Sequence, residues 1–179
     1  GKSTGIYKSL NCGLGSSDNK NNVFENLALV KNRIKLNSNE IVLLKQIHSN
    51  KFCFINKKSR IKNNNLRGDA LITNKINTPI GVLTADCAPI LIFDQKNKMV
   101  AAIHSGWKGA YKEIVKEVIK FMIEKGCSTN NITAVIGPCI SHESYEIKQD
   151  FMKKFIKKDK NNIIFFKKIR NKIFFNLNK

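Results

Sequence analysis

Three side chains that commonly bind metals stand at the ends of three apolar runs. Each of His48, Cys87 and His104 is the last residue of a short run of mainly aliphatic residues. If these runs are neighbouring strands, their ends bring two imidazoles and a thiolate together. Three such ligands leave a fourth tetrahedral position for water or substrate, which is typical of a catalytic zinc site rather than a structural one. The pattern therefore predicts a metal centre at these three residues.

The spacing leaves two other interpretations open. The three residues lie far apart in the sequence, and no close Cys-x-x-Cys or His-x-x-x-His pair accompanies them. A buried cysteine with two hydrogen-bonded histidines fits the same pattern. A nucleophilic Cys87 with His104 as its base would instead make a metal-free hydrolase or acyl-transfer enzyme. The multicopper oxidases are excluded, because the three histidines of the chain are too few for their copper centres.

The segments around these residues predict one domain, 1–179, of the α+β class. Apolar periodicity predicts helices at 22–36, 110–125 and 151–156. Short β-branched and aliphatic runs predict strands at 41–44, 51–55, 70–73, 80–84, 89–93, 99–104, 132–136, 163–166 and 172–177. We expect 51–55 to pair with 41–44, and we expect the central runs and 132–136 to be covered on both faces because they are continuously apolar. Several strands are joined by links too short for a helix, which favours α+β over a doubly wound sheet.

The composition is typical of a globular protein. The 179 residues are 42% hydrophobic and 25% charged, which excludes a disordered or fibrous chain. No apolar run approaches the roughly 20 residues needed to cross a bilayer, and no apolar leader opens the sequence. Five scattered cysteines form no disulfide framework and suit a reducing compartment. We therefore expect a cytoplasmic protein with no membrane partner.

The positive charge favours no specific nucleic-acid partner. The formal net charge is +19, but of the 32 Lys and Arg residues only four are Arg. Arginine is the usual side chain for phosphate and base recognition. The segment 148–179 holds 11 basic and 2 acidic residues, which we interpret as a solvated face that retains nucleic acid nonspecifically at low salt. A basic nucleic-acid-binding module stays the alternative to an enzyme.

Six short segments occur in the order typical of one protein family. They are Ser9-Leu10-Asn11, Gln46-Ile47-His48-Ser49, Gly68-Asp69-Ala70-Leu71-Ile72-Thr73, Leu83-Thr84-Ala85-Asp86-Cys87-Ala88-Pro89, Ile103-His104-Ser105-Gly106-Trp107-Lys108-Gly109 and Ile136-Gly137-Pro138-Cys139-Ile140. Over nearly its whole length the chain resembles the YfiH-like laccase-domain family, once called polyphenol oxidases and now regarded as zinc-containing purine nucleoside phosphorylases with adenosine deaminase activity. The resemblance implies a layered α/β/β/α fold, shared with cysteine hydrolases of the toxin deamidase type.

The resemblance also implies roles for individual residues. The family's metal ligands fall on His48, Cys87 and His104, with zinc as the expected metal and copper as the second choice. The candidate catalytic residues are Cys87, His104, Asp86 and Asp69, the carboxylates being candidates for proton transfer. The candidate substrate-binding residues are Asn11, Trp107, Lys108 and Cys139. Turn closure, ring packing and an inert thiol are the structural alternatives for Asn11, Trp107 and Cys139.

The implied partners are a purine nucleoside, such as adenosine, inosine or methylthioadenosine, and phosphate, with base and ribose 1-phosphate as products. The expected assembly is a monomer or homodimer. Two departures from the family qualify this prediction. Lys108 stands where the family has arginine, which keeps the charge but loses the bidentate fork. We also expect the chain to lack N- and C-terminal segments that full-length family members have. If those segments complete the nucleoside pocket, we expect this chain to bind metal but to be inactive.

Overall fold

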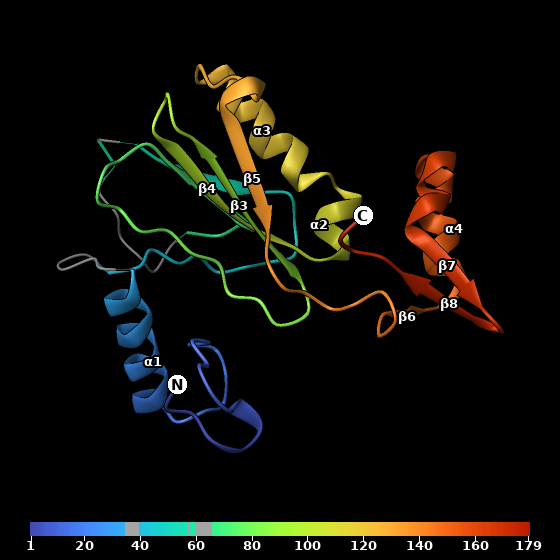
Figure 1. Cartoon of the computed structure of the whole chain (residues 1–179), viewed down its shortest axis with the longest axis horizontal. Helices are drawn as coiled ribbons and strands as arrows, with labels where there is room; N and C mark the ends of the chain where they lie inside the picture. Colours follow the sequence, from blue (N-terminus) through green and yellow to red (C-terminus); the bar gives the residue numbers. More distant parts are fainter. Residues whose placement is uncertain (35–39, 57, 60–65) are drawn as a thin grey trace.

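The fold is described for residues 1–34, 40–56, 58–59 and 66–179 of a computed structural model. Its centre is a five-stranded mixed sheet in the order β1-β2-β4-β3-β5 (Figure 1). The strands are β1 (Phe52–Ile55), β2 (Ala70–Thr73), β3 (Ala88–Asp94), β4 (Met99–Ser105) and β5 (Ile132–Ile136). β1 and β2 are parallel and the other neighbours are antiparallel. The mixed sheet with its helices confirms the predicted α+β class.

One face of this sheet is covered by α3 (Ile114–Glu124), which follows the short helix α2 (Trp107–Tyr111). Ile114, Val118 and Met122 of α3 are fully buried in the main hydrophobic core. The sequence predicts a single helix over 110–125, but the helix is interrupted at Glu113, which has the left-handed φ of 59°. Because α3 begins as a separate helix after this break, the direction of its apolar stripe along the sheet is not fixed by the direction of α2.

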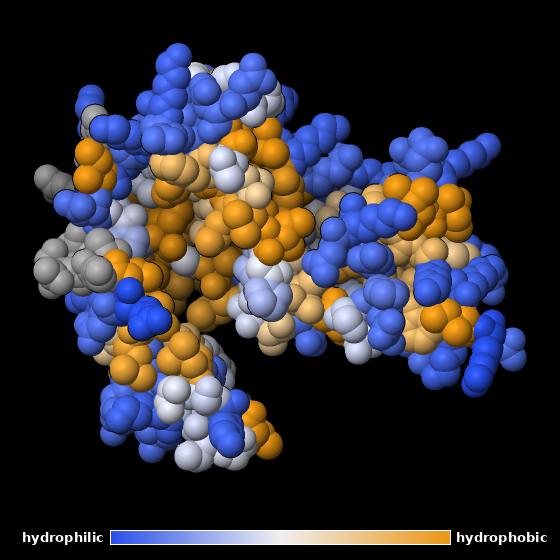
Figure 2. Space-filling view, in the orientation of Figure 1, coloured by the Kyte–Doolittle hydropathy of each residue, from blue (hydrophilic) through white to orange (hydrophobic). Residues whose placement is uncertain are grey.

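The opposite face of the sheet is covered only in part. A second hydrophobic cluster of Val42, Leu44, Ile55 and Leu71 lies there. Over β3 and β5 the face is open: Leu91 and Val135, which are register partners, are 58% and 59% exposed. Figure 2 shows hydrophobic residues gathered in this region. The prediction that 132–136 is buried on both faces is therefore wrong, since β5 is the edge strand of a half-open sheet.

A smaller antiparallel sheet lies apart from the first, in the order β6-β8-β7 (Figure 1). Its strands are β6 (Glu146–Ile147), β7 (Phe166–Ile169) and β8 (Lys172–Phe175), and it is covered by α4 (Gln149–Lys158). The rings of Phe151, Phe155, Phe166 and Phe175 pack together with centroids 5.0–6.2 Å apart. The 3-10 helix Lys160–Phe165 takes most of the predicted strand 163–166.

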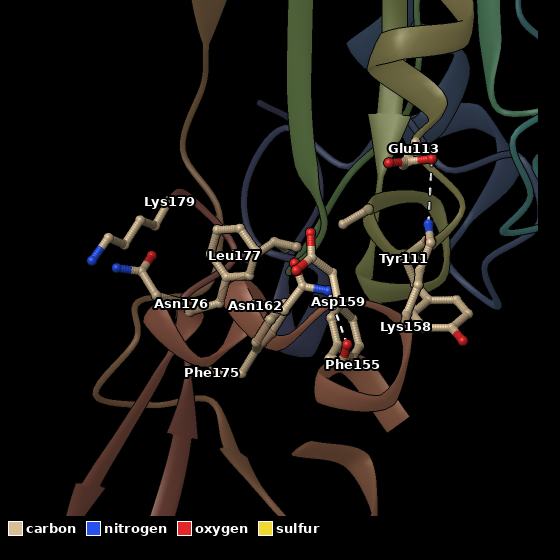
Figure 3. A pocket seen from close by; sticks show the side chains of 12 residues that line it. Tyr111, Glu113, Phe155, Lys158, Asp159, Asn162, Phe175, Asn176, Leu177 and Lys179 are labelled. Carbon is tan, nitrogen blue, oxygen red and sulfur yellow. Dashed lines mark hydrogen bonds and ion pairs between the residues drawn. The ribbon is translucent and has the colours of Figure 1, made fainter. Parts of the chain in front are cut away.

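A pocket of about 380 Å³ opens between this smaller sheet and α2 (Figure 3). Its wall includes the rings of Tyr111, Phe155 and Phe175, and Lys158 reaches across to Glu113 with an Nζ to Oε2 distance of 3.3 Å. None of the site residues predicted from the sequence lines this pocket. It is therefore separate from the candidate metal centre described below.

The N-terminal segment is attached to α1 (Lys20–Arg33) by a buried asparagine. Asn26 has no exposed surface, and its amide accepts from the Lys2 nitrogen at 2.7 Å and donates to Ser3 Oγ at 2.9 Å. The predicted helix 22–36 is confirmed as far as Arg33, while 35 and 36 lie outside the described residues. The short 3-10 helices Gly5–Tyr7 and Thr129–Asn131 complete the fold.

The two predicted strands at 41–44 and 80–84 do not form ladders. They meet through a single parallel bridge, Val42 to Ile80, and a second bridge joins Lys45 to Arg67. β1 pairs with β2 rather than with 41–44. Among the described residues, no helix combines the length and apolarity needed to span a bilayer.

Candidate metal centre

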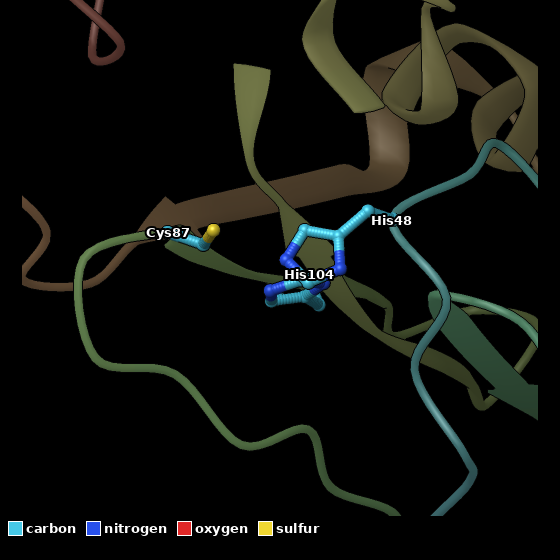
Figure 4. A group of neighbouring side chains, drawn as sticks. All are labelled: His48, Cys87 and His104. Atoms are coloured by element: carbon cyan, nitrogen blue, oxygen red, sulfur yellow. The ribbon is translucent and has the colours of Figure 1, made fainter. Parts of the chain in front are cut away.

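The structure brings His48, Cys87 and His104 together, and their ligand atoms all lie within 4.8 Å of one another. The three side chains point toward a common space (Figure 4), and the two imidazole rings meet edge to face with centroids 4.9 Å apart. In a tetrahedral zinc site the bond lengths place neighbouring ligands roughly 3.5 Å apart. Small side-chain rotations therefore suffice to bring all three donors onto one ion. The group could hold a metal.

Each ligand reaches the centre from a different kind of local structure. His104 lies in β4, opposite Pro89 of the antiparallel β3, and Cys87 stands directly before β3. His48 lies in a turn with a left-handed φ of 54°. Only His104 therefore belongs to a strand, and the expected meeting of three strand ends is replaced by one strand and two loops.

Gly106 makes room for the thiol of Cys87. A Cβ built at this position would lie 2.6 Å from Cys87 Sγ and 3.6 Å from His48 Cδ2. Real Cβ atoms essentially never approach sulfur so closely, so any side chain here would displace the thiol. The space that a side chain at Gly106 would fill lies where the three ligands converge. Leaving this space open fits a site that binds an ion.

Two hydrogen-bonded connections hold the loop ligands in place. The side-chain amide of Gln46 donates from Nε2 to the Leu83 carbonyl and accepts at Oε1 from the Leu83 nitrogen, both at 2.8 Å. The Ile140 nitrogen donates to the Asp86 carbonyl at 3.0 Å. The first connection ties the His48 segment to the Cys87 segment, and the second places Cys139 and its neighbours beside Cys87.

Asp69 lies beneath the centre with no exposed surface. Its Oδ1 is 3.0 Å from His104 Nδ1 and accepts from the His48 nitrogen at 2.9 Å. Its Oδ2 accepts from the nitrogen and the hydroxyl of Ser49 at 2.6 and 2.7 Å. The carboxylate therefore touches both segments that carry imidazole ligands.

Burial and hydrogen bonding set the protonation states of these groups. Burial lowers the pKa of His104 below its ordinary value, although the contact with Asp69 opposes this shift. Burial acts to raise the pKa of Asp69, but the hydrogen bonds from Ser49, His104 and His48 outweigh it and hold that pKa below the ordinary value. A neutral imidazole beside an ionised carboxylate is the state in which a histidine binds metals.

Two of the other predicted residues lie near the centre. Asp86 precedes Cys87 and is exposed. Burial, followed by the charges of Asp86 and Asp69, raises the pKa of Cys87. Cys139 is half-buried, and its thiol donates to Asn178 Oδ1 at 2.9 Å.

The remaining three contact other parts of the fold. Trp107 begins α2, and its ring packs edge-on against Phe151 with centroids 5.1 Å apart. The ammonium group of Lys108 lies 5.6 Å from the centre of the Trp107 ring. The Asn11 side chain is occupied within its own segment, since it donates to Ser16 and Asp18 and accepts from the Gly13 nitrogen, each at 3.0 Å.

Sequence reasoning did not single out four residues that shape the centre. Gln46, Ser49 and Gly106 belong to segments that carry the family resemblance, so the segments contained them but gave no role. Tyr145 had no sequence signal. Burial, followed by the charges of Cys87 and Asp86, raises the pKa of Tyr145.

A mixed α+β fold with two imidazoles and a thiol at the end of its central sheet defines a candidate metalloprotein. The chain belongs to the family described as multi-copper polyphenol oxidoreductase laccase, whose model matches residues 1–179. This finding confirms the resemblance seen in the sequence. The structure is also similar to that of the hypothetical protein YfiH from Bacillus licheniformis, with a TM-score of 0.87 and 26% identity over 97% of this chain and 68% of that one.

Two curated relatives carry enzyme names. The chain is 35% identical over 150 residues to the purine nucleoside phosphorylase RP494 of Rickettsia prowazekii, a match that covers 84% of this chain and 60% of that protein. It is 33% identical over 124 residues to the adenosine deaminase RL5 of an unknown prokaryotic organism, covering 66% of this chain and 47% of that protein. The matched region thus spans about half to three-fifths of these relatives.

Proposed function

We propose that this chain carries the zinc centre of a purine nucleoside phosphorylase that also deaminates adenosine. The observation that carries the proposal is the convergence of His48, Cys87 and His104 from three separate segments. Two nitrogen donors and one sulfur donor suit zinc with one open position, and copper is the second choice for the same set. The names of the relatives support the choice of substrate and reactions.

Zinc held there would supply a Lewis acid at the reacting part of the nucleoside. In phosphorolysis, phosphate attacks the ribose C1′ while the purine leaves, so a cation must hold the phosphate. We assign this role to Lys108, which is exposed. Its ammonium group lies 5.6 Å from the centre of the Trp107 ring, so the side chain would have to turn away from that ring to bind phosphate. Its single ammonium group would bind phosphate as a point charge rather than through a fork.

Deamination at purine C6 needs a carboxylate that moves a proton between the attacking water and the leaving amine. Asp86 is exposed and adjacent to Cys87, so we assign the proton transfer to Asp86. Asp69, the other candidate from the sequence, has no exposed surface and does not reach a substrate.

The test uses the longest natural form of the protein, purified without chelators, with adenosine and phosphate as substrates. We expect about one zinc per chain, adenine as the product of phosphorolysis and inosine as the product of deamination. Cys87→Ala should lose the zinc and both products. The control is Cys127→Ala, because Cys127 is buried in the main core. This variant should keep the zinc and form both products. A protein that carries no metal, and whose activity is indifferent to Cys87→Ala, would overturn the proposal.

The metal-free Cys–His hydrolase makes the opposite prediction for Cys87. A cysteine nucleophile has a lowered pKa, whereas burial raises the pKa of Cys87 here. We expect slow alkylation of Cys87 by iodoacetamide at neutral pH and further protection by zinc. Rapid alkylation that zinc does not change would favour the hydrolase.

A further inference from the structure

We propose that Asp69 is a positioning residue that prepares both histidine ligands before a metal binds. One carboxylate selects the ring tautomer of His104 and holds the turn that presents His48. This inference rests on the metal centre proposed above, but not on the reaction that the centre performs.

The carboxylate of Asp69 sets the tautomer of the His104 ring. An ionised carboxylate accepts hydrogen bonds and cannot donate them. The 3.0 Å contact between Asp69 Oδ1 and His104 Nδ1 therefore requires the proton on Nδ1. The lone pair is then on Nε2, the nitrogen that does not touch Asp69. A carboxylate that orients a histidine in this way also strengthens the imidazole as a ligand.

The same carboxylate holds the turn that carries His48. Three successive backbone N–H groups, those of Ile47, His48 and Ser49, donate to the same carboxylate at 3.2, 2.9 and 2.6 Å. The left-handed φ of 54° at His48 is an unfavourable conformation for a residue with a Cβ. Charge-assisted hydrogen bonds are about twice as strong as neutral ones, so these three offset the strain and keep the His48 ring turned toward the centre.

The central sheet sets the position of Asp69 itself. Its nitrogen donates to the Lys51 carbonyl, and its carbonyl accepts from the His104 nitrogen, both at 2.7 Å. The same residue thus connects the beginnings of β1 and β2 to the end of β4 with its backbone, and two metal ligands with its side chain. A displacement of Asp69 would move both imidazoles together.

Asp94 is the matched control, because it is equally buried and has no contact with the centre. Its carboxylate accepts from the Asn97 and Ser128 nitrogens at 2.8 and 3.3 Å and holds a turn. Asp94→Asn should therefore reduce stability without changing the metal centre. Asp69→Asn keeps the shape of the side chain. Both oxygens of Asp69 accept hydrogen bonds, so the NH₂ group of asparagine would face a hydrogen-bond donor in either orientation and one of these bonds would be lost.

The experiment measures the metal-free protein first. Nitrogen-15 NMR of the wild type should show His104 with its proton on Nδ1, and Asp69→Asn should give a mixture of tautomers. Competition with a zinc chelator should show zinc affinity about 10–100-fold lower in Asp69→Asn and unchanged in Asp94→Asn. Thermal unfolding of each variant reports how much stability it has lost.

Two results would overturn the inference. One is an unchanged tautomer and zinc affinity in Asp69→Asn. The other is an equal loss of affinity in Asp94→Asn, which would mean that Asp69 acts only through stability. A changed tautomer in a protein without nucleoside activity would leave this inference standing and remove the proposed function.

If Asp69→Asn does not fold, Ser49→Ala takes its place. This variant removes the hydroxyl that donates to Asp69 Oδ2 at 2.7 Å and accepts from the Lys51 nitrogen at 3.1 Å. We expect faster hydrogen exchange at the amides of 47–49 and a smaller loss of zinc affinity than the 10–100-fold range above. Unchanged exchange and affinity in this variant would contradict the role of Asp69.

Discussion

At the scale of single residues, the candidate metal centre depends on the absence of a side chain at Gly106. The backbone angles at Gly106, φ −82° and ψ −178°, are open to any residue, so its need for glycine is steric rather than conformational. The space that a Cβ would take is held by Cys87 Sγ. A substitution at Gly106 therefore moves the Cys87 thiol without forcing the backbone at position 106 into a different conformation.

We predict that Gly106→Ala lowers zinc affinity by at least about tenfold, because the new methyl group pushes the Cys87 thiol away from the histidines. Chelator competition measures the affinity, and circular dichroism checks that the fold is retained. Gly15→Ala is the control, since a Cβ there meets nothing within 4 Å and should leave binding unchanged. Normal zinc affinity in Gly106→Ala would show that the thiol is not a ligand.

The thiol of Cys127 is buried in the core: the residue is 5% exposed, and its sulfur lies 3.8 Å from the Met99 sulfur. Burial, followed by the nearby Asp94, raises its pKa to about 11, above the roughly 8.5 of an unfolded cysteine. The folded state therefore keeps a proton that the unfolded state loses, so stability falls as pH rises. This contribution is fully present below about pH 8.5 and is lost as pH rises through about 11.

Urea unfolding measured between neutral and strongly alkaline pH tests this prediction. The free energy of unfolding of the wild type should decrease over the alkaline range, and Cys127→Ala should decrease less steeply. Because other thiols and Tyr145 also have raised pKa values, the difference between the two proteins is the quantity to compare. Parallel profiles would contradict the assignment to Cys127.

At the scale of elements, α3 shows how one stripe of side chains secures the sheet that carries the centre. Met122 is fully buried, whereas its neighbour Ile123 is 44% exposed. We predict that Met122→Ala lowers the free energy of unfolding by about 2–5 kcal/mol, since it opens a cavity in the core. Ile123→Ala should change it by less than about 1 kcal/mol. Denaturant titration measures both, and equal effects would show that α3 lies differently on the sheet.

The sequence predicted most elements but not their surroundings. β2, β3, β4, β5 and α4 occur at or within a few residues of their predicted places. Continuous apolarity did not distinguish β2, buried at all four positions, from β3, where Leu91 and Phe93 are exposed. An apolar run says that a strand has hydrophobic side chains on both sides, and only the packing of other elements decides whether each side is covered. The break at Glu113 was missed for a similar reason, because helical periodicity continues through it.

At the scale of the whole molecule, the charge is a property of the surface rather than of the centre. The net charge of +19 and the excess of basic residues in 148–179 create a field that attracts polyanions. The extent of the chain as one domain, its cytoplasmic location and its assembly as a monomer or homodimer stay predictions.

We predict nonspecific binding to nucleic acid that weakens at least about tenfold between 50 and 200 mM salt. Fluorescence anisotropy with two unrelated DNA sequences should give equal affinities, and Cys87→Ala should not change them. Neutralising Lys153, Lys157 and Lys168, which lie in the basic segment, should weaken binding and flatten its salt dependence. A strong preference for one sequence at physiological salt would revive the nucleic-acid-binding module as the function.

The sequence by itself determined the donor set of the candidate metal centre, the α+β class and the family, because these depend on residue types and on their order along the chain. Tertiary structure alone decided that Asp69 is buried beneath two histidines, that Gly106 leaves room for a thiol, and that His48 approaches from a left-handed turn. The contacts of Asp69 and Gly106 join residues 19 or more positions apart. Such contacts arise from the way the sheet brings β1, β2 and β4 together, and no local pattern of side chains encodes them.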